Sequence, residues 1–307
     1  MIRPLNLVDT ARITVLRGFD WAVTPTGPAS GNPSSFSPGA FLWDRFQPRH
    51  GSAAWISTKG AKTVGLVSAR PCSGPTAWMV KHLVTPLREE EPCCELLGRV
   101  AVHAGRRGAE RLFLHLPDDW HLVEMVGQSG FVPCTQVFLF TLAGRSPLLG
   151  VEPAKGFQPR TSNDDFSLFR LRNATTPADV QCGIGTTFQQ WEDAQDTQRK
   201  GTRELVLEQD GESKVWIRLD YYRKWTKIRL VVHPAWEGDL QSLVALALAQ
   251  KPSRIIMFEV PEYQIVLRAL LERVGFEITG SYRLVVKSLA IRVKEPSLAP
   301  LPTASYG

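Results

Sequence analysis

Apolar and polar residues form a pattern that occurs twice along the chain. A strand-like run closed by proline occupies residues 78–86, and a matching run occupies residues 226–234. Both runs alternate or are continuously apolar, as half-buried strands are. A segment with apolar residues at helical spacing follows each run, at 93–104 and 240–249. The pattern therefore predicts the same strand and the same amphipathic helix in each half.

Two further landmarks keep the same order in both halves. Short apolar runs closed by proline, residues 111–117 and 254–261, predict buried strands. A second helical pattern then ends in Gly-Phe, at Gly130 and at Gly275, where glycine can close a helix in the left-handed conformation. The landmarks are separated by roughly 145 residues, and similarity at a fixed spacing is the signature of an internal repeat.

Hairpins and final strands complete each repeat. Residues 53–69 and 204–220 read as hairpins, and the second contains Asp210-Gly211, a strong short-range hairpin signal. Alternating strands close the halves at 135–142 and 281–288. Each half thus reads helix, hairpin, strand, helix, strand, helix, strand, which predicts an α/β fold with a mixed sheet and helices on its faces.

The chain of 307 residues suits two domains of about 150 residues each. We expect an N-terminal domain at 1–142, a linker rich in glycine and proline at 143–158, and a C-terminal domain at 159–295. Residues 296–307 contain three prolines and predict a disordered tail. The stretch 24–39, rich in Pro, Gly, Ser and Thr, predicts a long loop within the first domain.

Composition narrows the class of protein. Hydrophobic residues make up 43% of the chain, enough for two cores. No window reaches the roughly 18 apolar residues of a membrane span, and the N-terminus lacks the apolar core of a secretory signal, so a cytoplasmic protein away from membranes is predicted. The five cysteines show neither C-x-x-C spacing nor a zinc pattern, which predicts no metal site. The net charge of +6 is spread along the chain, so nucleic acid is not indicated as a partner.

The order of elements resembles the GNAT acyltransferase superfamily, twice and over nearly the whole chain. Val232-His233-Pro234 and Gly275-Phe276 stand where that family commonly has the same residues. The resemblance implies two tandem GNAT-like acyl-CoA N-acyltransferase domains. It further implies acetyl-CoA or another acyl-CoA as the cofactor, and a small-molecule amine or a protein as the acyl acceptor.

In that family, a central strand offers backbone groups to the pantetheine arm, and a glycine-rich loop before the next helix cradles the pyrophosphate. In the first half, residues 87–94 retain nothing of the loop motif, and Glu89 takes the place of its Arg or Gln. In the second half, Glu237 takes that place, and a glycine of the preceding turn and a small serine remain. The resemblance therefore assigns the cofactor site to the second half, at Leu230, Val231, Val232, Gly238, Asp239, Leu240 and Ser242.

Catalytic residues stay unassigned. The family often uses a tyrosine four residues before the Gly of Gly-Phe to protonate the leaving thiolate. Val126 and Leu271 occupy those positions here, and neither side chain can donate a proton. We therefore keep two hypotheses open: an N-acyltransferase whose cofactor site lies in the second half, and a non-catalytic tandem module that binds a small molecule or a protein.

Other polar residues receive structural interpretations. The run 218–229 mixes bases with aromatic residues, as an anion-binding or nucleic-acid-binding strip does, but its alternation favours a hairpin with one solvated face. Glu259 is expected to point outward from its strand. His82 and His115, which lie on predicted strands without paired ligand spacing, are expected to be structural or exposed.

Overall fold

The computed structural model describes residues 1–6, 9, 22–23, 41, 52–60, 62–85, 90–143, 148, 150–196, 201–250, 252–253 and 255–289. The predicted loop at 24–39, the predicted tail at 296–307 and Glu89 lie outside these residues.

From the hairpin onward, the first half contains the predicted elements in the predicted order; the helix predicted before the hairpin falls in the part of the chain that the structure does not describe. Its strands and helices are β1 Ile2–Pro4, β2 Ala22–Val23, β3 Ala53–Lys59, β4 Lys62–Pro71, β5 Ala77–Val84, α3 Glu90–Arg106, β6 Arg111–Pro117, α4 Trp120–Gly127 and β7 Val132–Ala143. Asp119 caps α4 by accepting a hydrogen bond from the His121 amide at 3.0 Å. Gly130 has φ +80°, which confirms the left-handed glycine after the helix.

The second half repeats the series and adds three short helices before its hairpin. It contains β8 Gln158–Pro159, the 3-10 helix η2 Ser162–Asp164, α5 Asp165–Thr175, α6 Ala178–Ile184, α7 Phe188–Ala194, β9 Thr202–Gln209, β10 Glu212–Tyr221, β11 Trp225–Val232, α8 Leu240–Ala249, β12 Ile255–Pro261, α9 Ile265–Arg273 and β13 Glu277–Ser288. Asp210 and Gly211 both have positive φ, 54° and 73°, which confirms the Asp-Gly turn between β9 and β10.

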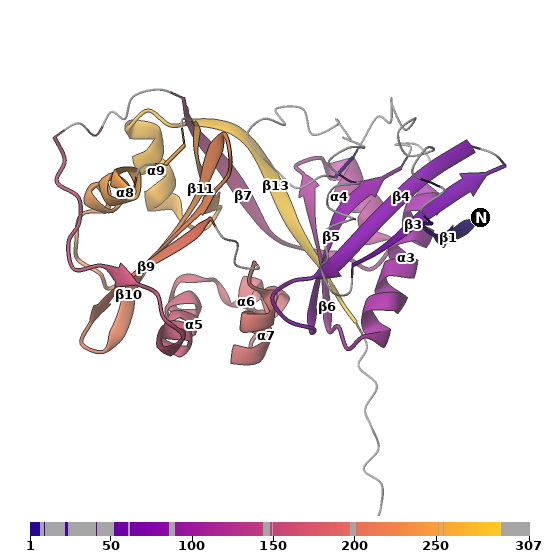
Figure 1. The fold of residues 1–307 in the computed structure, drawn as a ribbon, viewed down its shortest axis with the longest axis horizontal. Coiled ribbons are helices and arrows are strands. Elements are labelled where there is room, and N and C mark those ends of the chain that lie inside the picture. Colours follow the sequence, from indigo (N-terminus) through magenta and orange to yellow (C-terminus); the bar gives the residue numbers. More distant parts are fainter. Residues whose placement is uncertain are drawn as a thin grey trace, which may run out of the picture.

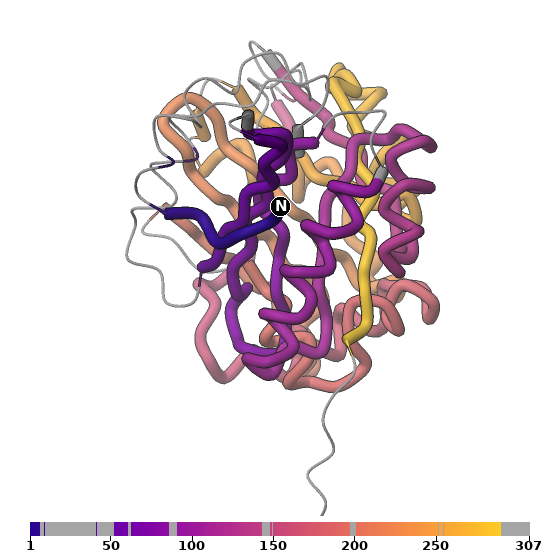
Figure 2. Tube along the Cα trace, turned by 90° about the vertical axis from the view of Figure 1, so that its right-hand side faces the viewer, coloured from indigo at the N-terminus to yellow at the C-terminus, as the bar shows by residue number. Residues whose placement is uncertain are grey.

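All thirteen strands of the described residues form one sheet, because the two halves exchange their last strands. The order is β1-β3-β4-β5-β6-β13-β7-β12-β11-β10-β9-β8, and β2, the thirteenth strand, pairs with β5 off this path. β13 of the second half therefore pairs with β6 of the first, and β7 of the first half pairs with β12 of the second. The long strands β7 and β13 lie antiparallel at the centre (Figure 1). In Figure 2 the yellow β13 runs beside the magenta part of the trace.

Helices cover the two faces of the sheet differently. In the second half, α8 and α9 pack with Ile228, Leu230 and Phe258. Trp216 and Val231 point to the opposite face, where they pack with α5 and α7. In the first half, α3 and α4 pack on β3 to β6 in the same way as α8 and α9 do in the second. The face that carries α5 to α7 is also the face of Arg218 and Arg229, which lie two residues along their strands from Trp216 and Val231.

The exchanged strands lead to a test of how the halves depend on each other. We insert a protease site after Gly150 and cleave the folded protein. Because β13 completes the sheet of the first half and β7 that of the second, the two fragments should co-elute as one particle in gel filtration and separate only in denaturant. Separation into two folded fragments in native buffer would contradict the exchange.

Candidate functional site

The strands β11 and β12 part after four residue pairs. Their parallel pairing runs from Trp225–Ile255 to Ile228–Phe258 and then stops, although both strands continue. Beyond this fork, β11 keeps its antiparallel pairing with β10 up to Val232. The side of β11 at residues 229–232 that faces β12 therefore has no strand partner among the described residues, and we call it the open edge.

Backbone directions show which groups the open edge presents. The His233 amide donates to the Lys214 carbonyl of the β10 side at 2.8 Å. Since successive residues of a strand point to alternate sides, the N–H and C=O groups of Val231 also face β10, and those of Leu230 and Val232 face the open edge. Gln264 agrees with this, because its Nε2 donates to the Leu230 carbonyl at 3.2 Å.

The corresponding edge in the first half is covered. β5 and β6 also part after four pairs, from Ala77–Arg111 to Val80–Leu114. Here β2 pairs with β5 beyond the fork, with Ala22 opposite Val84 and Val23 opposite Leu83. The two forks have the same geometry, but only the second lacks a strand on its edge within the described chain.

Solved structures share the overall fold of this chain. The sequence matches no protein-family model and no curated protein. A GCN5-related N-acetyltransferase from Sphaerobacter thermophilus superposes with a TM-score of 0.58 at 16% identity, covering 94% of this chain and 95% of that one. A tandem GNAT protein from the clavulanic acid biosynthesis pathway superposes with a TM-score of 0.51 at 15% identity, covering 94% and 98%. The chain has a tandem GNAT fold. Identities this low carry the fold alone.

In this GNAT fold, the start of α8 is capped by the protein itself. Asp239 Oδ1 accepts a hydrogen bond from the Gln241 amide at 3.0 Å. The Asp239 carbonyl accepts from the Ser242 amide at 3.1 Å and from its hydroxyl at 2.6 Å. Asp239 and Ser242, both predicted as cofactor residues, thus bond to each other, and their roles toward a cofactor stay predictions.

The turn before α8 is filled as well. The ring of Trp236 lies so close to Gly238 that a Cβ atom there would overlap it. Leu240, the first residue of α8, packs on the core of the second half. The structure therefore separates the seven predicted residues into an open strand edge and a capped helix start.

A buried amide group lies beside the open edge. Gln264 precedes α9, and its Oε1 is buried with no hydrogen-bond partner among the described residues. An unpaired buried acceptor is costly, and a ligand that donates an N–H there would satisfy it. The pantetheine arm carries two amide groups, so Leu230, Val232 and Gln264 fit that part of an acyl-CoA. Sequence reasoning missed Gln264, because only its contact with Leu230 reveals it.

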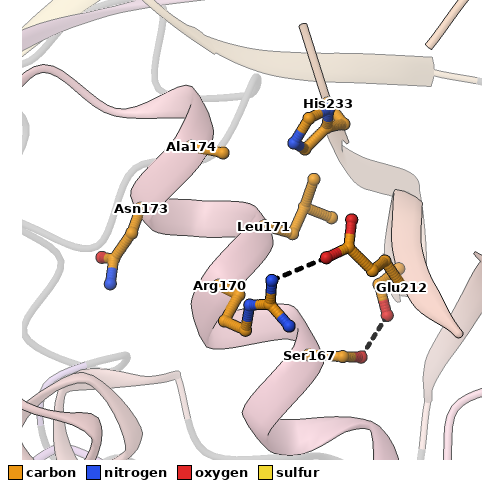
Figure 3. A pocket seen from close by; sticks show the side chains of 8 residues that line it. Ser167, Arg170, Leu171, Asn173, Ala174, Glu212 and His233 are labelled. Carbon is orange, nitrogen blue, oxygen red and sulfur yellow. Dashed lines mark hydrogen bonds and ion pairs between the residues drawn. The ribbon is translucent and has the colours of Figure 1, made fainter. Parts of the chain in front are cut away.

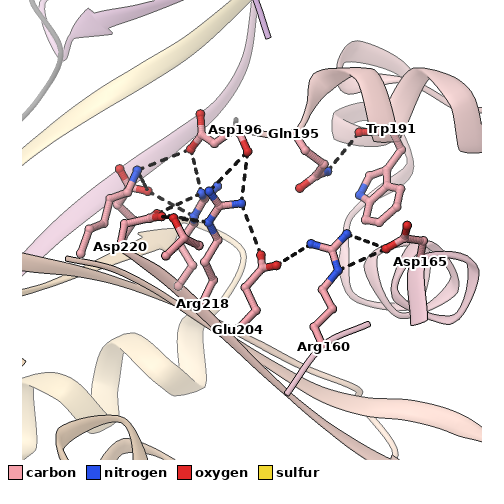
Figure 4. Close-up of polar contacts among 12 residues, drawn as sticks. Arg160, Asp165, Trp191, Gln195, Asp196, Glu204, Arg218 and Asp220 are labelled. Carbon is pink, nitrogen blue, oxygen red and sulfur yellow. Dashed lines mark hydrogen bonds and ion pairs between the residues drawn. The ribbon is translucent and has the colours of Figure 1, made fainter. Parts of the chain in front are cut away.

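The polar face of the run 218–229 is largely buried, with Arg223 and Lys224 exposed at the turn, which corrects the expectation of a solvated face. Arg218 is only 2% exposed and lies between the carboxylates of Glu204 (3.3 Å) and Asp220 (3.2 Å). Arg160 bridges Glu204 to Asp165, at 2.6 Å to each (Figure 4). The alternation was interpreted correctly, but the polar face turns inward and its charges compensate each other.

The polar network reaches the fork. Arg229, one residue beyond it, contacts Asp196 at 2.7 Å and Glu259 at 3.7 Å. Lys227 Nζ lies 3.3 Å from Glu259, and the Tyr282 hydroxyl donates to Glu259 Oε1 at 3.5 Å. Glu259 is buried, so the expectation that it points outward is wrong. The positive charges of Lys227 and Arg229 stabilise the negative charge of Glu259 and so offset the free-energy cost of burying it.

His115 from the first half belongs to the same group. Its ring lies 4.5 Å from the ring of Tyr282. Burial, assisted by the charge of Lys81, lowers the pKa of His115 to about 4, so the ring is neutral at pH 7. Burial raises the pKa of Asp196, but Lys227 and Arg229 outweigh it and hold this pKa well below its ordinary value. The strand exchange thus brings polar residues of both halves onto one face.

A separate pocket of about 300 Å³ lies between α5 and the start of β10 (Figure 3). It is lined by Ser167, Arg170, Leu171, Asn173, Ala174, Glu212, Ser213 and His233. Arg170 and Glu212 form an ion pair at 2.6 Å across it. His233 follows Ile228 by five residues, which places the pocket about 16 Å along the strand from the fork. The pocket is therefore distinct from the fork.

Proton-donating side chains are missing where the family often has them. Val126 and Leu271 are both fully buried in the apolar cores.

Among the described residues, no cluster of three His, Cys, Asp or Glu side chains suits a metal ion. None of the helices placed in the structure is long and apolar enough to cross a membrane.

The buried network predicts a large stability effect at Arg218. Arg218→Ala removes the buried cation between Glu204 and Asp220, leaving them only Arg160 and Arg229 as cationic partners, and should lower the free energy of unfolding by about 3–5 kcal/mol. The measurement is urea denaturation at pH 7. Arg170→Ala removes an ion pair in which the arginine is 62% exposed, so its midpoint should match the wild type. Equal midpoints for both variants would contradict a stabilising role for the network.

The lowered pKa of His115 predicts a pH dependence. In the unfolded chain the imidazole takes up a proton near pH 6.5, but in the folded protein only near pH 4. The unfolded state therefore binds more protons between these values, and His115 reduces stability as the pH falls through that window. His115→Gln should lose less stability than the wild type between pH 7 and pH 4.5, measured by urea midpoints. Parallel pH profiles would refute this assignment.

Proposed function

We propose that the protein is an N-acyltransferase that holds one acyl thioester at the open edge of β11. The observation that carries the proposal is the asymmetry of the two forks. The edge of the first half is paired with β2, whereas Leu230 and Val232 of the second half present backbone groups without a strand partner in the described chain. We accordingly expect one thioester per chain.

The bound thioester would supply an activated acyl group for transfer to an amine. In our proposal, Leu230 and Val232 bind the amide groups of the pantetheine arm, and Gln264 orients it. An arm laid along this edge directs its reactive end toward the fork at Ile228 and Phe258. The open edge then acts by positioning, which can supply much of the rate enhancement of a bimolecular reaction.

We place the acceptor on the sheet face opposite α8 and α9, where Arg229 and Glu259 flank the fork. Glu259 lies 3.3 Å from Lys227 Nζ and 3.7 Å from Arg229 Nε, and its carboxylate orients an amine by accepting a hydrogen bond from it. A neutral amine attacks the thioester carbonyl directly: the C–N bond forms, the C–S bond breaks, and the leaving thiolate takes up the proton that the amine loses. Val126 and Leu271 stand where the family often has its acid tyrosine, so neither supplies that proton. An amine with a low pKa is therefore the preferred acceptor class.

A non-catalytic binding module is the second candidate function. The buried Val126 and Leu271 and the capped start of α8 favour it. The two candidates differ in one observable, the release of free thiol from a bound acetyl thioester when an amine is added. Thiol release with amine acylation supports transfer, and stable binding without release supports the module.

The binding step is tested by titration calorimetry with acetyl-CoA. We expect one site per chain. Val232→Pro removes the N–H group at the open edge without touching the pairing with β10, and should weaken binding at least about tenfold. Leu83→Pro makes the matched change in the first half, because Leu83 faces α3 and α4 as Val232 faces α8 and α9, and β2 already covers the edge there; it should leave the affinity unchanged. Two sites per chain, or equal effects of both variants, would contradict the proposal.

A further inference from the structure

The start of α8 and the open edge of β11 suit different parts of an acyl-CoA molecule. We propose that the second half recognises its acyl donor through the pantetheine arm alone, so that pantetheine thioesters without a nucleotide serve as well as acyl-CoA. This inference rests on the proposed function, because it takes the open edge as the site of the arm.

Two amides at the start of α8 already donate hydrogen bonds within the protein and are not available to a diphosphate. A helix N-terminus binds phosphate through unpaired N–H groups and the positive end of its dipole. Here the Gln241 amide donates to the Asp239 carboxylate at 3.0 Å, and the Ser242 amide donates to the Asp239 carbonyl at 3.1 Å. A carboxylate thus already occupies the place where the helix would bind an anion.

Other parts of the protein also fill the space at the start of α8. Trp236 packs against Gly238 on one side. From the segment before β8, the Ala154 amide donates to the Ser242 carbonyl at 3.1 Å, which brings this segment against the first turn of α8. The neighbouring Lys155 forms an ion pair with Glu152 at 3.5 Å. A diphosphate at α8 would have to displace these contacts.

The negative charges at the turn before α8 also disfavour a bound diphosphate. Glu237 and Asp239 are both exposed at this turn, and the phosphates of CoA are anionic. Exposed like charges weaken binding modestly, and salt screens the effect. Two such carboxylates are expected to cancel the contribution of the nucleotide to affinity rather than prevent binding of the arm.

The surroundings of the open edge suit an uncharged arm. Its polar groups belong to Leu230, Val232 and Gln264, which bond to amides without requiring charge. Next to Gln264, the first two residues of α9 are strongly exposed, Ile265 at 69% and Val266 at 70%. An apolar rim of this kind favours the methyl and methylene groups of a pantetheine arm over a hydrated phosphate.

The test compares affinities of the full-length protein for three probes: acetyl-CoA, S-acetylpantetheine and adenosine 3′,5′-bisphosphate. The two thioesters should bind within about threefold of each other, and the nucleotide should not bind at millimolar concentration. An affinity for acetyl-CoA more than about tenfold higher than for S-acetylpantetheine would overturn the inference while leaving the proposed function intact. No binding of either thioester would overturn both.

A charge-removing variant tests the cause. Asp239→Asn keeps a good helix cap but removes the negative charge, so it should strengthen acetyl-CoA binding several-fold and leave S-acetylpantetheine unchanged. Asp119→Asn makes the same change at the α4 cap of the first half and should affect neither ligand. Equal effects of Asp239→Asn on both thioesters would overturn the role assigned to the helix start.

Free thioesters and carrier proteins both present the pantetheine arm. Titration with an acetylated phosphopantetheinyl carrier protein distinguishes these sources. Binding comparable to that of S-acetylpantetheine identifies a carried donor. Affinity for the small thioester alone identifies a free donor, and either result supports recognition through the arm.

Discussion

The antiparallel pairing of β7 with β13 is the constraint on which the rest of the structure depends. It runs from Glu277–Thr141 to Val286–Val132 and places the last strand of each half inside the other half's sheet. β6 and β12 would otherwise present unpaired edges, which proteins rarely leave open. A second tether acts at the turn before β5, where the amide and hydroxyl of Thr76 donate to Asp193 at 3.1 and 2.5 Å. The halves therefore form one folding unit.

The same pairing explains the charged interior. By joining the halves edge to edge, it places the residues just beyond both forks, Lys81 and His115 in the first half and Arg229 and Glu259 in the second, on one face. Buried ions are tolerated only when each is compensated. On this face Glu259 and Asp196 share the cations Lys227 and Arg229, so removing one cation weakens the compensation of both carboxylates.

Sequence reasoning identified the elements because they depend on local periodicity. The repeat, the Asp-Gly turn and the glycines after α4 and α9 follow from patterns within a few residues. The strand exchange was missed, since two similar repeats offer equivalent partners for β7 and β13 and only the three-dimensional arrangement selects between them. For the run 218–229, alternation indicated a polar face but not whether that face points to solvent or to the interior. The carboxylates of Asp196 and Glu259, which compensate the charges of Lys227 and Arg229, come from distant segments of the chain. The assignment of cofactor residues remains a prediction from resemblance.

The two forks explain how a repeat can become asymmetric without losing its fold. A parting pair of strands leaves backbone groups that must be satisfied by water, a ligand or the protein. In the first half β2 satisfies two positions of β5, and that half keeps an intact core. In the second half Gln264 satisfies only the Leu230 carbonyl, and its own Oε1 lacks a partner in the described residues. A side chain is more easily displaced than a paired strand. Within the described chain, the polar groups of the second fork are therefore satisfied less completely than those of the first.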